Sequence, residues 1–322
     1  MILSIVVPCY NETEVLRETT TRLTQVLQHL VEVGKVSAKS FIMFINDGSK
    51  DGTWELIAEL YKSNKYIYGL NLAGNVGHQN ALMAGLLTAK EMSDICISID
   101  ADLQDDVKVI ESMVDKYVEG FDIVYGVRKS RKTDTFIKRN SALGFYKLMQ
   151  KLGVNSVYNH ADYRLMSKRA IEQLSQFKER NLFLRGIVPL IGYNTTSIYY
   201  DRCERFAGES KYPFRKMVNF AIDGITSFSV RPVRLIAATG FLLLLISILA
   251  LIYVIYAVIT GHAVAGWASM MLSIWFIGSI ILISIGVIGE YIGKIYIEVK
   301  ERPRYNIETI LSHKEDEEIR QN

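Results

Sequence analysis

Four carboxylates fall within one short stretch of the sequence, at the point where a buried strand should end. Residues 98–106 read SIDADLQDD and follow an apolar run. Asp100 and Asp102 should project to one side, because strand side chains alternate with a period of two, and Gln104 continues this alternation if the chain stays extended. Mg²⁺ and Mn²⁺ prefer such oxygen ligands, and typically bind one or two carboxylates together with substrate phosphates and water. The stretch therefore predicts a divalent-cation site.

A purely structural interpretation of the same stretch stays open. Asp-rich turns and helix caps are common, and Asp105 and Asp106 are expected to cap the helix that follows. The spacing of the carboxylates alone does not decide between a solvated turn and a metal site.

Polar segments also follow the first three predicted strands. They read PCYNE, NDGSKDGT and NVGHQNALMAGL. Asp47, at the tip of the second strand, is a candidate to bind the base or ribose of a nucleotide. Asn75 and Gly77 stand at a helix start, where free amides and the helix dipole favour phosphate.

These segments have structural alternatives too. Asn11, Glu12 and Asp51 are suited to capping helices, and Gly48 to a tight turn. His78 is expected to be a local hydrogen-bonding residue, since no second histidine lies at metal-ligand spacing.

Short apolar strands alternate with helical segments through the first 130 residues. The strands are predicted near residues 2–7, 41–46, 66–72, 94–100 and 121–127. This alternation predicts an α/β fold with a doubly wound, mostly parallel sheet. Ligands of such sheets bind at the carboxyl ends of the strands, where the polar segments lie. A GxGxxG dinucleotide fingerprint is absent from the sequence.

Composition narrows the classes of function. The net charge of +3 over 322 residues does not indicate nucleic-acid binding. The three cysteines show no CxxC spacing, which favours reduced thiols in the cytosol. The N-terminus lacks the basic region of a signal peptide, so we expect it to be a first strand.

Two long uncharged runs predict a membrane hairpin. Residues 235–260 and 267–289 carry no formal charge, and at 1.5 Å per residue they span about 39 and 35 Å. A hydrocarbon core is about 30 Å thick, so a pair of buried core helices is the weaker interpretation. Lysine and arginine lie outside the pair and are absent from its connector, which predicts that both termini and the soluble domain are cytoplasmic.

An amphipathic helix is predicted just before the hairpin. Its pattern suits either a helix at the membrane interface or one packed on the soluble domain, and both interpretations stay open. The expected organisation is a cytosolic α/β domain (1–212), an interfacial helix (213–232), two transmembrane helices (233–298) and a cytosolic juxtamembrane tail (299–322).

Taken in order, the motifs resemble one family. PCYNE, NDGSKDGT, NVGHQNALMAG and DADLQDD are together similar to the GT-A fold of family 2 glycosyltransferases. DYRLMSKRA, ERNLFLRG, GESKY, GEYIGKIYIEVKERPRY and the two apolar runs resemble polyprenyl-phosphate glycosyltransferases, which include bactoprenol glucosyltransferases and dolichol-phosphate mannose synthases. The resemblance extends to about Tyr305. Two positions depart from the pattern, Asn46 and Val107, where relatives often have Asp and Pro.

The resemblance implies roles for individual residues. Asp162 would be catalytic or would position the sugar, while Arg128 and Arg131 would meet the acceptor phosphate, unless they form only a solvated basic loop. The implied set is Pro8, Tyr10, Glu12, Asp47, Asn75 and Asp100 for the nucleotide, Asp102 and Gln104 for Mg²⁺ or Mn²⁺, Asp162, Arg128, Arg131, Arg164 and Lys211 for catalysis, and Arg205 close to the phosphates.

The resemblance also implies a reaction. A hexose would pass, with inversion, from a nucleotide sugar to undecaprenyl phosphate at the cytoplasmic face of a bacterial plasma membrane, with UDP-glucose the first candidate donor and UDP-GlcNAc the second. A separate flippase would move the lipid-linked sugar outward for envelope glycosylation. The oligomeric state, including a homo-oligomer, stays open.

Other functions are weighed against this one. A non-catalytic nucleotide-binding membrane scaffold and a glycosyltransferase that uses GDP-mannose or another acceptor are both alternatives. A processive synthase is disfavoured because the chain lacks QxxRW. A transporter is disfavoured because neither apolar run has an ionisable residue in its middle.

Overall fold

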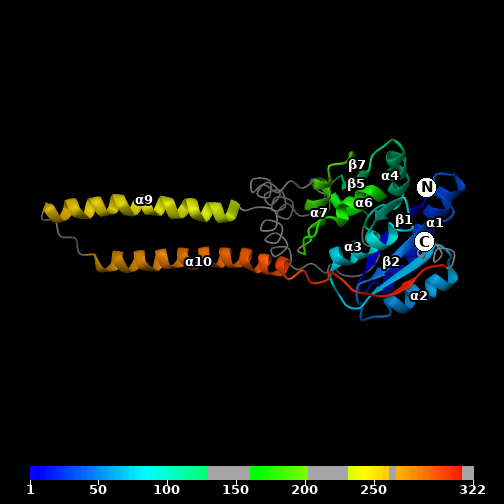
Figure 1. The fold of residues 1–322 in the computed structure, drawn as a ribbon, viewed down its shortest axis with the longest axis horizontal. Coiled ribbons are helices and arrows are strands. Elements are labelled where there is room, and N and C mark those ends of the chain that lie inside the picture. The colour runs from blue at the N-terminus through cyan, green and yellow to red at the C-terminus, as the bar shows by residue number, and fades with distance from the viewer. Residues whose placement is uncertain (130–159, 181, 202–230, 261–265, 314–322) are drawn as a thin grey trace. The chain divides into compact units, whose positions relative to one another are not determined.

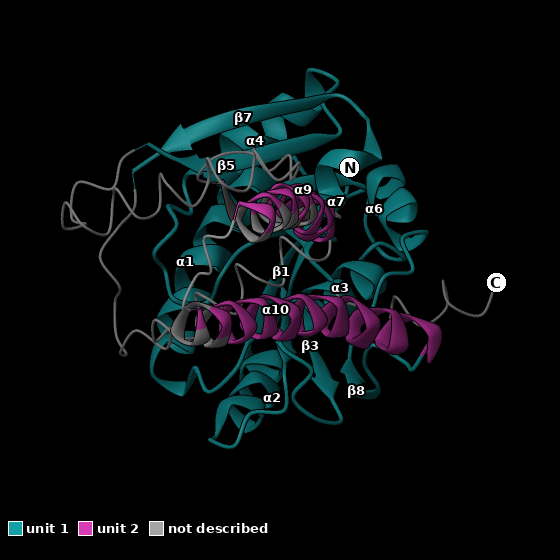
Figure 2. Cartoon of the chain, turned by 90° about the vertical axis from the view of Figure 1, so that its left-hand side faces the viewer, with its two compact units in different colours: residues 1–146, 155–213, 302–322 teal, residues 147–154, 214–301 magenta. Residues whose placement is uncertain are grey.

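The computed structural model describes residues 1–129, 160–180, 182–201, 231–260 and 266–313. The chain divides into two compact units (Figure 2). The sheet unit comprises residues 1–146, 155–213 and 302–322, and the helical unit comprises residues 147–154 and 214–301. Each unit is described by itself below.

One mixed eight-stranded sheet forms the sheet unit (Figure 1). The strand order is β7-β5-β6-β4-β1-β2-β3-β8, in which β3, β2, β1 and β4 are parallel neighbours and β6 runs antiparallel between β4 and β5. The bounds are β1 Leu3–Cys9, β2 Phe41–Asn46, β3 Ile67–Leu72, β4 Ile95–Ser98, β5 Ile123–Arg128, β6 His160–Ser167, β7 Thr195–Tyr200 and β8 Ile307–Leu311. The prediction of an α/β sheet that is parallel over its first four strands is confirmed.

Helices connect the parallel strands and cover the sheet. They are α1 Thr13–Glu32, α2 Thr53–Ser63, α3 His78–Ala89, α4 Val109–Val118, α6 Lys168–Ser175 and α7 Leu184–Ile187, followed by the 3₁₀ turn η1 Val188–Ile191. All residues of β1 to β4 are buried, as expected of strands covered on both faces. At Gly85 of α3, an added Cβ would lie 2.6 Å from side-chain carbons of both Val6 and Ile45. Glycine therefore lets α3 pack directly on the sheet.

The last strand of the sheet comes from the C-terminal segment. β8 pairs antiparallel with β3, so residues that follow the helical unit in sequence complete the edge of the sheet. The sequence analysis assigns residues 299–322 to a juxtamembrane tail and does not anticipate this strand. Such edge pairing depends on a partner more than 230 residues away, because Gly69 faces Leu311.

The helical unit contains two long helices that contact each other, α9 (Arg231–Ile259) and α10 (Trp267–Val299). Their described large apolar side chains are exposed; Phe241 and Trp275, for example, are 70% and 71% exposed. Within the described residues, the stretch that is long and apolar enough to cross a membrane is Ser273–Val299. The second predicted span stays a prediction. The interfacial helix predicted at 213–232 lies almost wholly outside the described residues.

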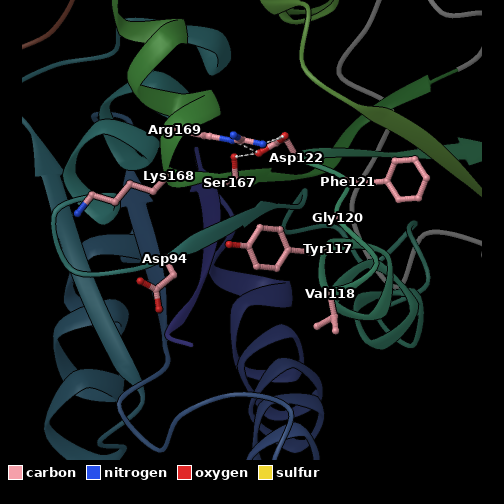
Figure 3. Close-up of a pocket in the computed structure, with 9 residues that line it drawn as sticks. All are labelled: Asp94, Tyr117, Val118, Gly120, Phe121, Asp122, Ser167, Lys168 and Arg169. Atoms are coloured by element: carbon pink, nitrogen blue, oxygen red, sulfur yellow. Dashed lines mark hydrogen bonds and ion pairs between the residues drawn. The ribbon is translucent and has the colours of Figure 1, made fainter.

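A hollow of about 510 Å³ is lined by residues next to the amino ends of β4 and β5, among them Asp94 and Asp122 (Figure 3). Beside it, Asp122 accepts hydrogen bonds from Arg169 Nε and Nη2 at 2.6 and 2.5 Å and from Ser167 Oγ at 2.8 Å. Arg169, with Ser167, holds the pKa of Asp122 below its usual range. Asp122 therefore joins the start of β5 to the end of β6 and the start of α6.

Asp122→Asn is expected to lower the thermal unfolding temperature (Tm) by roughly 2–4 °C, since Arg169 is exposed and its ion pair is screened. A carboxyl group with a lowered folded-state pKa stabilises the protein above its unfolded pKa of about 4, and this contribution disappears as the pH falls through the folded-state value. Thermal unfolding of both proteins between pH 7 and pH 3 tests this. A difference in Tm that grows on acidification contradicts it.

Candidate functional site

Three loops at the carboxyl ends of β1, β2 and β3 are tied together by hydrogen bonds. The Asn11 amide N–H donates to Ser49 Oγ at 3.0 Å, and Asn11 Oδ1 accepts the Lys50 amide N–H at 2.9 Å. Asn11 has φ +54°, a left-handed conformation that asparagine tolerates better than most residues. Asn75 Nδ2 donates to the Asp47 carbonyl at 3.1 Å. These loops therefore form one cross-linked surface.

Asp47 is buried at the centre of these loops. Its two carboxylate oxygens accept the backbone amides of Val76 at 2.7 Å and Gly77 at 3.1 Å. Burial raises the pKa of Asp47, and the two amide hydrogen bonds oppose that rise. The carboxylate thus joins the second loop to the third, close to where the nucleotide is predicted to bind.

Gly48→Ala is expected to disrupt this surface. Gly48 has φ +60°, and a Cβ added there would lie 2.4 Å from the Asn75 amide nitrogen. Strain of about 2 kcal/mol corresponds to a Tm decrease on the order of 5 °C, and nucleotide binding should weaken about tenfold as the loops separate.

Gly52→Ala is the matched control, because a Cβ there would meet only Thr13 Cγ2 at 3.9 Å. Thermal unfolding and calorimetric titration with UDP compare the two variants. Equal behaviour of Gly48→Ala and Gly52→Ala would contradict the expectation.

The acidic segment after β4 is a turn rather than a continued strand. β4 ends at Ser98, and Leu103 has φ +57°, an unfavourable left-handed conformation for leucine. Asp102 Oδ1 accepts the Gln104 amide N–H at 3.2 Å within this turn. The strand alternation proposed for Asp100, Asp102 and Gln104 is therefore wrong, and the turn sets their directions instead.

Two carboxylates, one from the turn after β4 and one from β6, meet at one histidine. His78 Nε2, at the start of α3, lies 3.6 Å from Asp100 Oδ1 and 3.7 Å from Asp162 Oδ2. Asp162 is brought there by β6, whose Arg164 pairs with Ser98 of β4. Burial raises the pKa of Asp100 to about 6; His78 opposes the rise, and the nearby carboxylates reinforce it.

Two guanidinium groups hold the Asp162 carboxylate. Arg164 Nη2 donates to Oδ1 at 2.6 Å, and Arg185 Nη2 donates to Oδ2 at 3.0 Å. Arg164 is only 2% exposed, so its charge depends on this partner. Burial alone would raise the pKa of Asp162, but Arg185, Arg164 and His78 together hold it well below its usual range. Asp162 is therefore ionised and fixed in place at neutral pH.

A second buried ion pair lies behind the acidic turn. Asp105 is 2% exposed and accepts hydrogen bonds from Arg128 Nε at 2.9 Å, Arg128 Nη2 at 2.8 Å and Tyr200 Oη at 2.6 Å. Asp105 thus anchors the turn to β5 and β7 instead of capping α4. Asp106 Oδ1 accepts the Lys108 amide N–H, but Lys108 is itself the N-cap residue of α4 and makes no side-chain capping hydrogen bond, so the capping prediction is wrong for both carboxylates.

The remaining predicted residues divide into two groups. Pro8 is buried at the end of β1, Tyr10 is 37% exposed, and Glu12 is half-buried with its amide N–H donating to Thr53 Oγ1 at 3.0 Å. All three belong to the same cross-linked loops as Asp47 and Asn75, at the carboxyl ends of the strands. Three predicted cations lie outside the described residues, namely Arg131, Arg205 and Lys211.

Sequence reasoning underestimated two residues of this site. His78 was assigned only local hydrogen bonding, and Arg185 received no role, although it stands in the ERNLFLRG motif. The position of His78, at the start of a helix that follows a strand, could have indicated that it belongs to the site. The partner of Arg185 could not be read from the sequence, because Asp162 lies on a different element.

The donor set fits a hard divalent cation. Asp100, Asp102 and Gln104 offer oxygen atoms on one half-buried turn, and the clustered carboxylates raise the pKa of Asp100. In the described part of the chain, no three His, Cys, Asp or Glu side chains form a complete ligand group. An incomplete protein shell suits Mg²⁺ or Mn²⁺, which usually bind through one or two carboxylates plus substrate phosphates.

Comparison with known proteins matches the chain to described families. The model described as "Glycosyl transferase family 2" matches residues 4–175, and the one described as "GtrB C-terminal hairpin" matches residues 231–295. "Uncharacterized glycosyltransferase YkoT" of Bacillus subtilis (strain 168) is 57% identical over 307 residues, covering 95% of this chain and 91% of the relative. "Bactoprenol glucosyl transferase" of Shigella phage SfII is 41% identical over 312 residues, covering 95% and 97%.

Among solved structures, glucosyl-3-phosphoglycerate synthase from Mycobacterium tuberculosis, in complex with Mn²⁺, UDP-glucose and phosphoglyceric acid, matches with a TM-score of 0.45 and 16% identity. The match covers 70% of this chain and 77% of that chain.

Proposed function

Because the chain belongs to glycosyl transferase family 2 and carries a GT-A domain with a GtrB-type C-terminal hairpin, we propose that it transfers a hexose from a nucleotide sugar to undecaprenyl phosphate. The reaction inverts the configuration at the anomeric carbon and takes place at the cytoplasmic face of a bacterial plasma membrane. The product is a polyprenyl-monophosphate sugar, a donor for glycosylation of the cell envelope.

The observation that carries this proposal is the meeting of Asp100 and Asp162 at His78, beside the cross-linked loops. The site lies at the carboxyl ends of the parallel strands, where ligands of such sheets bind. Relatives named bactoprenol glucosyl transferase align over nearly the whole chain, which supports the lipid acceptor as well as the reaction type.

The chemistry needs no strong general base. An oxygen of the acceptor phosphate, already anionic near neutral pH, attacks the anomeric carbon. The bond from that carbon to the diphosphate oxygen breaks, and the nucleoside diphosphate leaves with the electron pair. Asp162 is already ionised and held by two guanidinium groups, so it serves to orient the sugar rather than to accept a proton.

Negative charge on the leaving diphosphate forms the main barrier. Mg²⁺ or Mn²⁺, held by Asp102 and Gln104 with Asp100 on the nucleotide side, would offset that charge as a Lewis acid. Arg131, Arg205 and Lys211 are proposed as further phosphate-binding cations. Arg128 pairs with Asp105, so its contribution to the acceptor site would come through the shape of the acidic turn.

The helical unit supplies the membrane attachment in this proposal. α9 and α10 would both cross the bilayer, with residues 213–232 at the interface and both termini in the cytoplasm. The acceptor phosphate sits at the headgroup level, so an anchored catalytic domain meets it there. A separate flippase would carry the lipid-linked sugar across the membrane.

The donor sugar is proposed from the names of the relatives. UDP-glucose is favoured because some aligned relatives, such as the one from Shigella phage SfII, are described as glucosyl transferases, and UDP-GlcNAc comes next. No residue in the described site distinguishes these sugars by its charge or hydrogen-bonding type.

Detergent-purified protein, undecaprenyl phosphate and Mg²⁺ or Mn²⁺ test the proposal, with a panel of UDP- and GDP-sugars. Release of nucleoside diphosphate and the mass of the lipid product are measured together. Formation of a lipid-phosphate-hexose with one UDP-sugar, abolished by EDTA, is the expected result. If only GDP-mannose gave a product, GDP-mannose would be the donor instead of a UDP-sugar. Nucleotide binding without any product would favour a non-catalytic scaffold or another acceptor.

A further inference from the structure

A row of hydrogen bonds crosses three adjacent strands, from the C-terminal segment to the predicted nucleotide loop. Asn71 Nδ2 on β3 donates to Glu308 Oε2 on β8 at 2.6 Å. Asn46 Nδ2 on β2 donates to Asn71 Oδ1 at 2.7 Å. Asn46 Oδ1 in turn accepts the Ser49 amide N–H at 3.3 Å. Ser49 lies in the loop that holds Asn11, so the row ends within the cross-linked surface.

The row has a fixed direction. An ionised carboxylate only accepts hydrogen bonds, and a backbone amide N–H only donates them. Each asparagine between them must therefore accept with its oxygen on the side of Ser49 and donate with its nitrogen on the side of Glu308. Asn46 and Asn71 are 4% and 8% exposed, and buried amides that lose a partner are costly.

A β-bulge directs Glu308 to this position. Asn71 pairs with Thr309, whereas the next residue of β3, Leu72, pairs with Ile307, so Glu308 is the extra residue of β8. In regular pairing, the side chain of Glu308 would point to the face opposite Asn71, because neighbouring residues of a strand alternate. The bulge changes that direction.

Described residues on both sides of this bulge, from Arg304 to His313, contact the rest of the sheet unit. The Ala73 amide N–H donates to the Asn306 carbonyl at 3.0 Å, and Arg304 Nη2 donates to the Phe177 carbonyl at 2.5 Å. Tyr61 Oη donates to the Ser312 carbonyl at 2.9 Å, and its ring stacks on His313. Glu308 is therefore presented by a fixed strand rather than by a loose tail.

We propose that Glu308 is a positioning residue for nucleotide binding, which acts through Asn71 and Asn46 on the loop at Asp47 to Asp51. This inference rests on the proposed nucleotide site and adds a role for the segment that follows the hairpin. Glu308 supplies the acceptor that completes the row begun at the Ser49 amide and so helps to hold the loop in its binding conformation.

Reversing the direction of the row tests the proposal. In Asn46→Asp, the new carboxylate only accepts, so Asn71 must turn its nitrogen to Asp and its oxygen to Glu308, an exposed carboxylate that cannot donate. The KM for the nucleotide sugar and the Kd of UDP should rise about tenfold. In the double variant N46D/E308Q, the glutamine nitrogen donates to Asn71, the row is complete in reverse, and the net charge is that of the wild type. Both constants should return to within about threefold of it.

Two control variants distinguish an effect of hydrogen-bond direction from an effect of net charge, and unfolding measurements distinguish both from a loss of stability. E308Q alone still offers an oxygen to Asn71 and should stay within about threefold of the wild type. N46D/E308A restores the net charge without a donor and should remain near the N46D value. Thermal unfolding of each variant gives the stability, which is compared with the Kd of UDP.

Failure of N46D/E308Q to recover UDP binding, or recovery by N46D/E308A to the same degree, would overturn the proposal. Changes in Tm without changes in KM or Kd would also overturn it, since the row would then be merely structural. An inactive wild-type protein that binds UDP and follows the predicted pattern would refute the transfer reaction alone. A wild-type protein that transfers sugar while all variants behave alike would refute this inference alone.

Discussion

Asp162→Asn should lower the turnover number by about a hundredfold, which corresponds to a loss of about 2.7 kcal/mol of transition-state stabilisation. Asparagine keeps the shape of the side chain but removes the charge that Arg164 and Arg185 share. The buried Arg164 would then lose its ion-pair partner, and the repulsion between the two guanidinium groups would no longer be offset by that carboxylate. A sugar positioned by this carboxylate would lose its alignment.

The pH dependence distinguishes a positioning role from a base. The pKa of Asp162 is held well below its usual range, so the carboxylate is ionised throughout pH 6–9 and its titration should not shape the rate. Turnover and KM of the wild type and Asp162→Asn, measured across that range, should give parallel profiles. A wild-type rate that rises with pH, with the slope lost in the variant, would identify Asp162 as a base instead. Full turnover by the variant would exclude both roles.

Asp122→Asn is the matched control for this experiment. It removes a carboxylate that also binds an arginine, but at the opposite end of the sheet (Figure 3). Its turnover should equal that of the wild type, while its Tm falls. Arg185→Lys, which keeps the charge of the arginine but not its forked geometry, should reduce turnover about tenfold.

Asp102→Ala should reduce transfer by roughly a thousandfold, since a Lewis-acid cation contributes several kcal/mol to stabilising charge in the transition state. Asp102 lies on the half-buried turn after β4, and its Oδ1 also accepts the Gln104 amide N–H. Its loss removes a predicted metal ligand and loosens the turn that carries Gln104, the other predicted ligand. Initial rates measured against Mg²⁺ and Mn²⁺ concentration should rise steeply for the wild type and scarcely for the variant.

Asp106→Ala provides the control on the same turn. Asp106 contacts the Lys108 amide, and its loss should leave activity within about threefold of the wild type. An Asp102→Ala protein with more than a third of wild-type activity and an unchanged metal response would show that Asp102 does not bind the cation.

Local patterns in the sequence determined much of the fold. Buried strands such as Ile42–Ile45 read as apolar runs because helices cover both faces of the sheet. Polar residues after those runs marked the carboxyl ends of the strands. The sequence alone therefore predicts that Asp47, Asp100 and the loop residues lie at these strand ends, since strand period and turn chemistry involve only neighbouring residues.

Tertiary structure decided which of these residues meet. β6 inserts antiparallel between β4 and β5, and this brings Asp162 beside Asp100 and His78. No period in the sequence encodes strand order, because pairing depends on how the whole sheet buries its faces. The same non-local choice pairs Arg185 with Asp162.

Two further features depended on long-range packing for the same reason. Arg128 is predicted from the sequence to bind the acceptor phosphate. In the fold it forms an ion pair with Asp105, because a buried carboxylate requires a partner. The C-terminal segment resembled a polar tail, but the open edge of β3 offers it a strand to pair with. The sequence by itself thus determined the kinds of chemistry and their places along the chain. Only the tertiary structure decided their partners, because the burial that selects a partner comes from the assembled sheet.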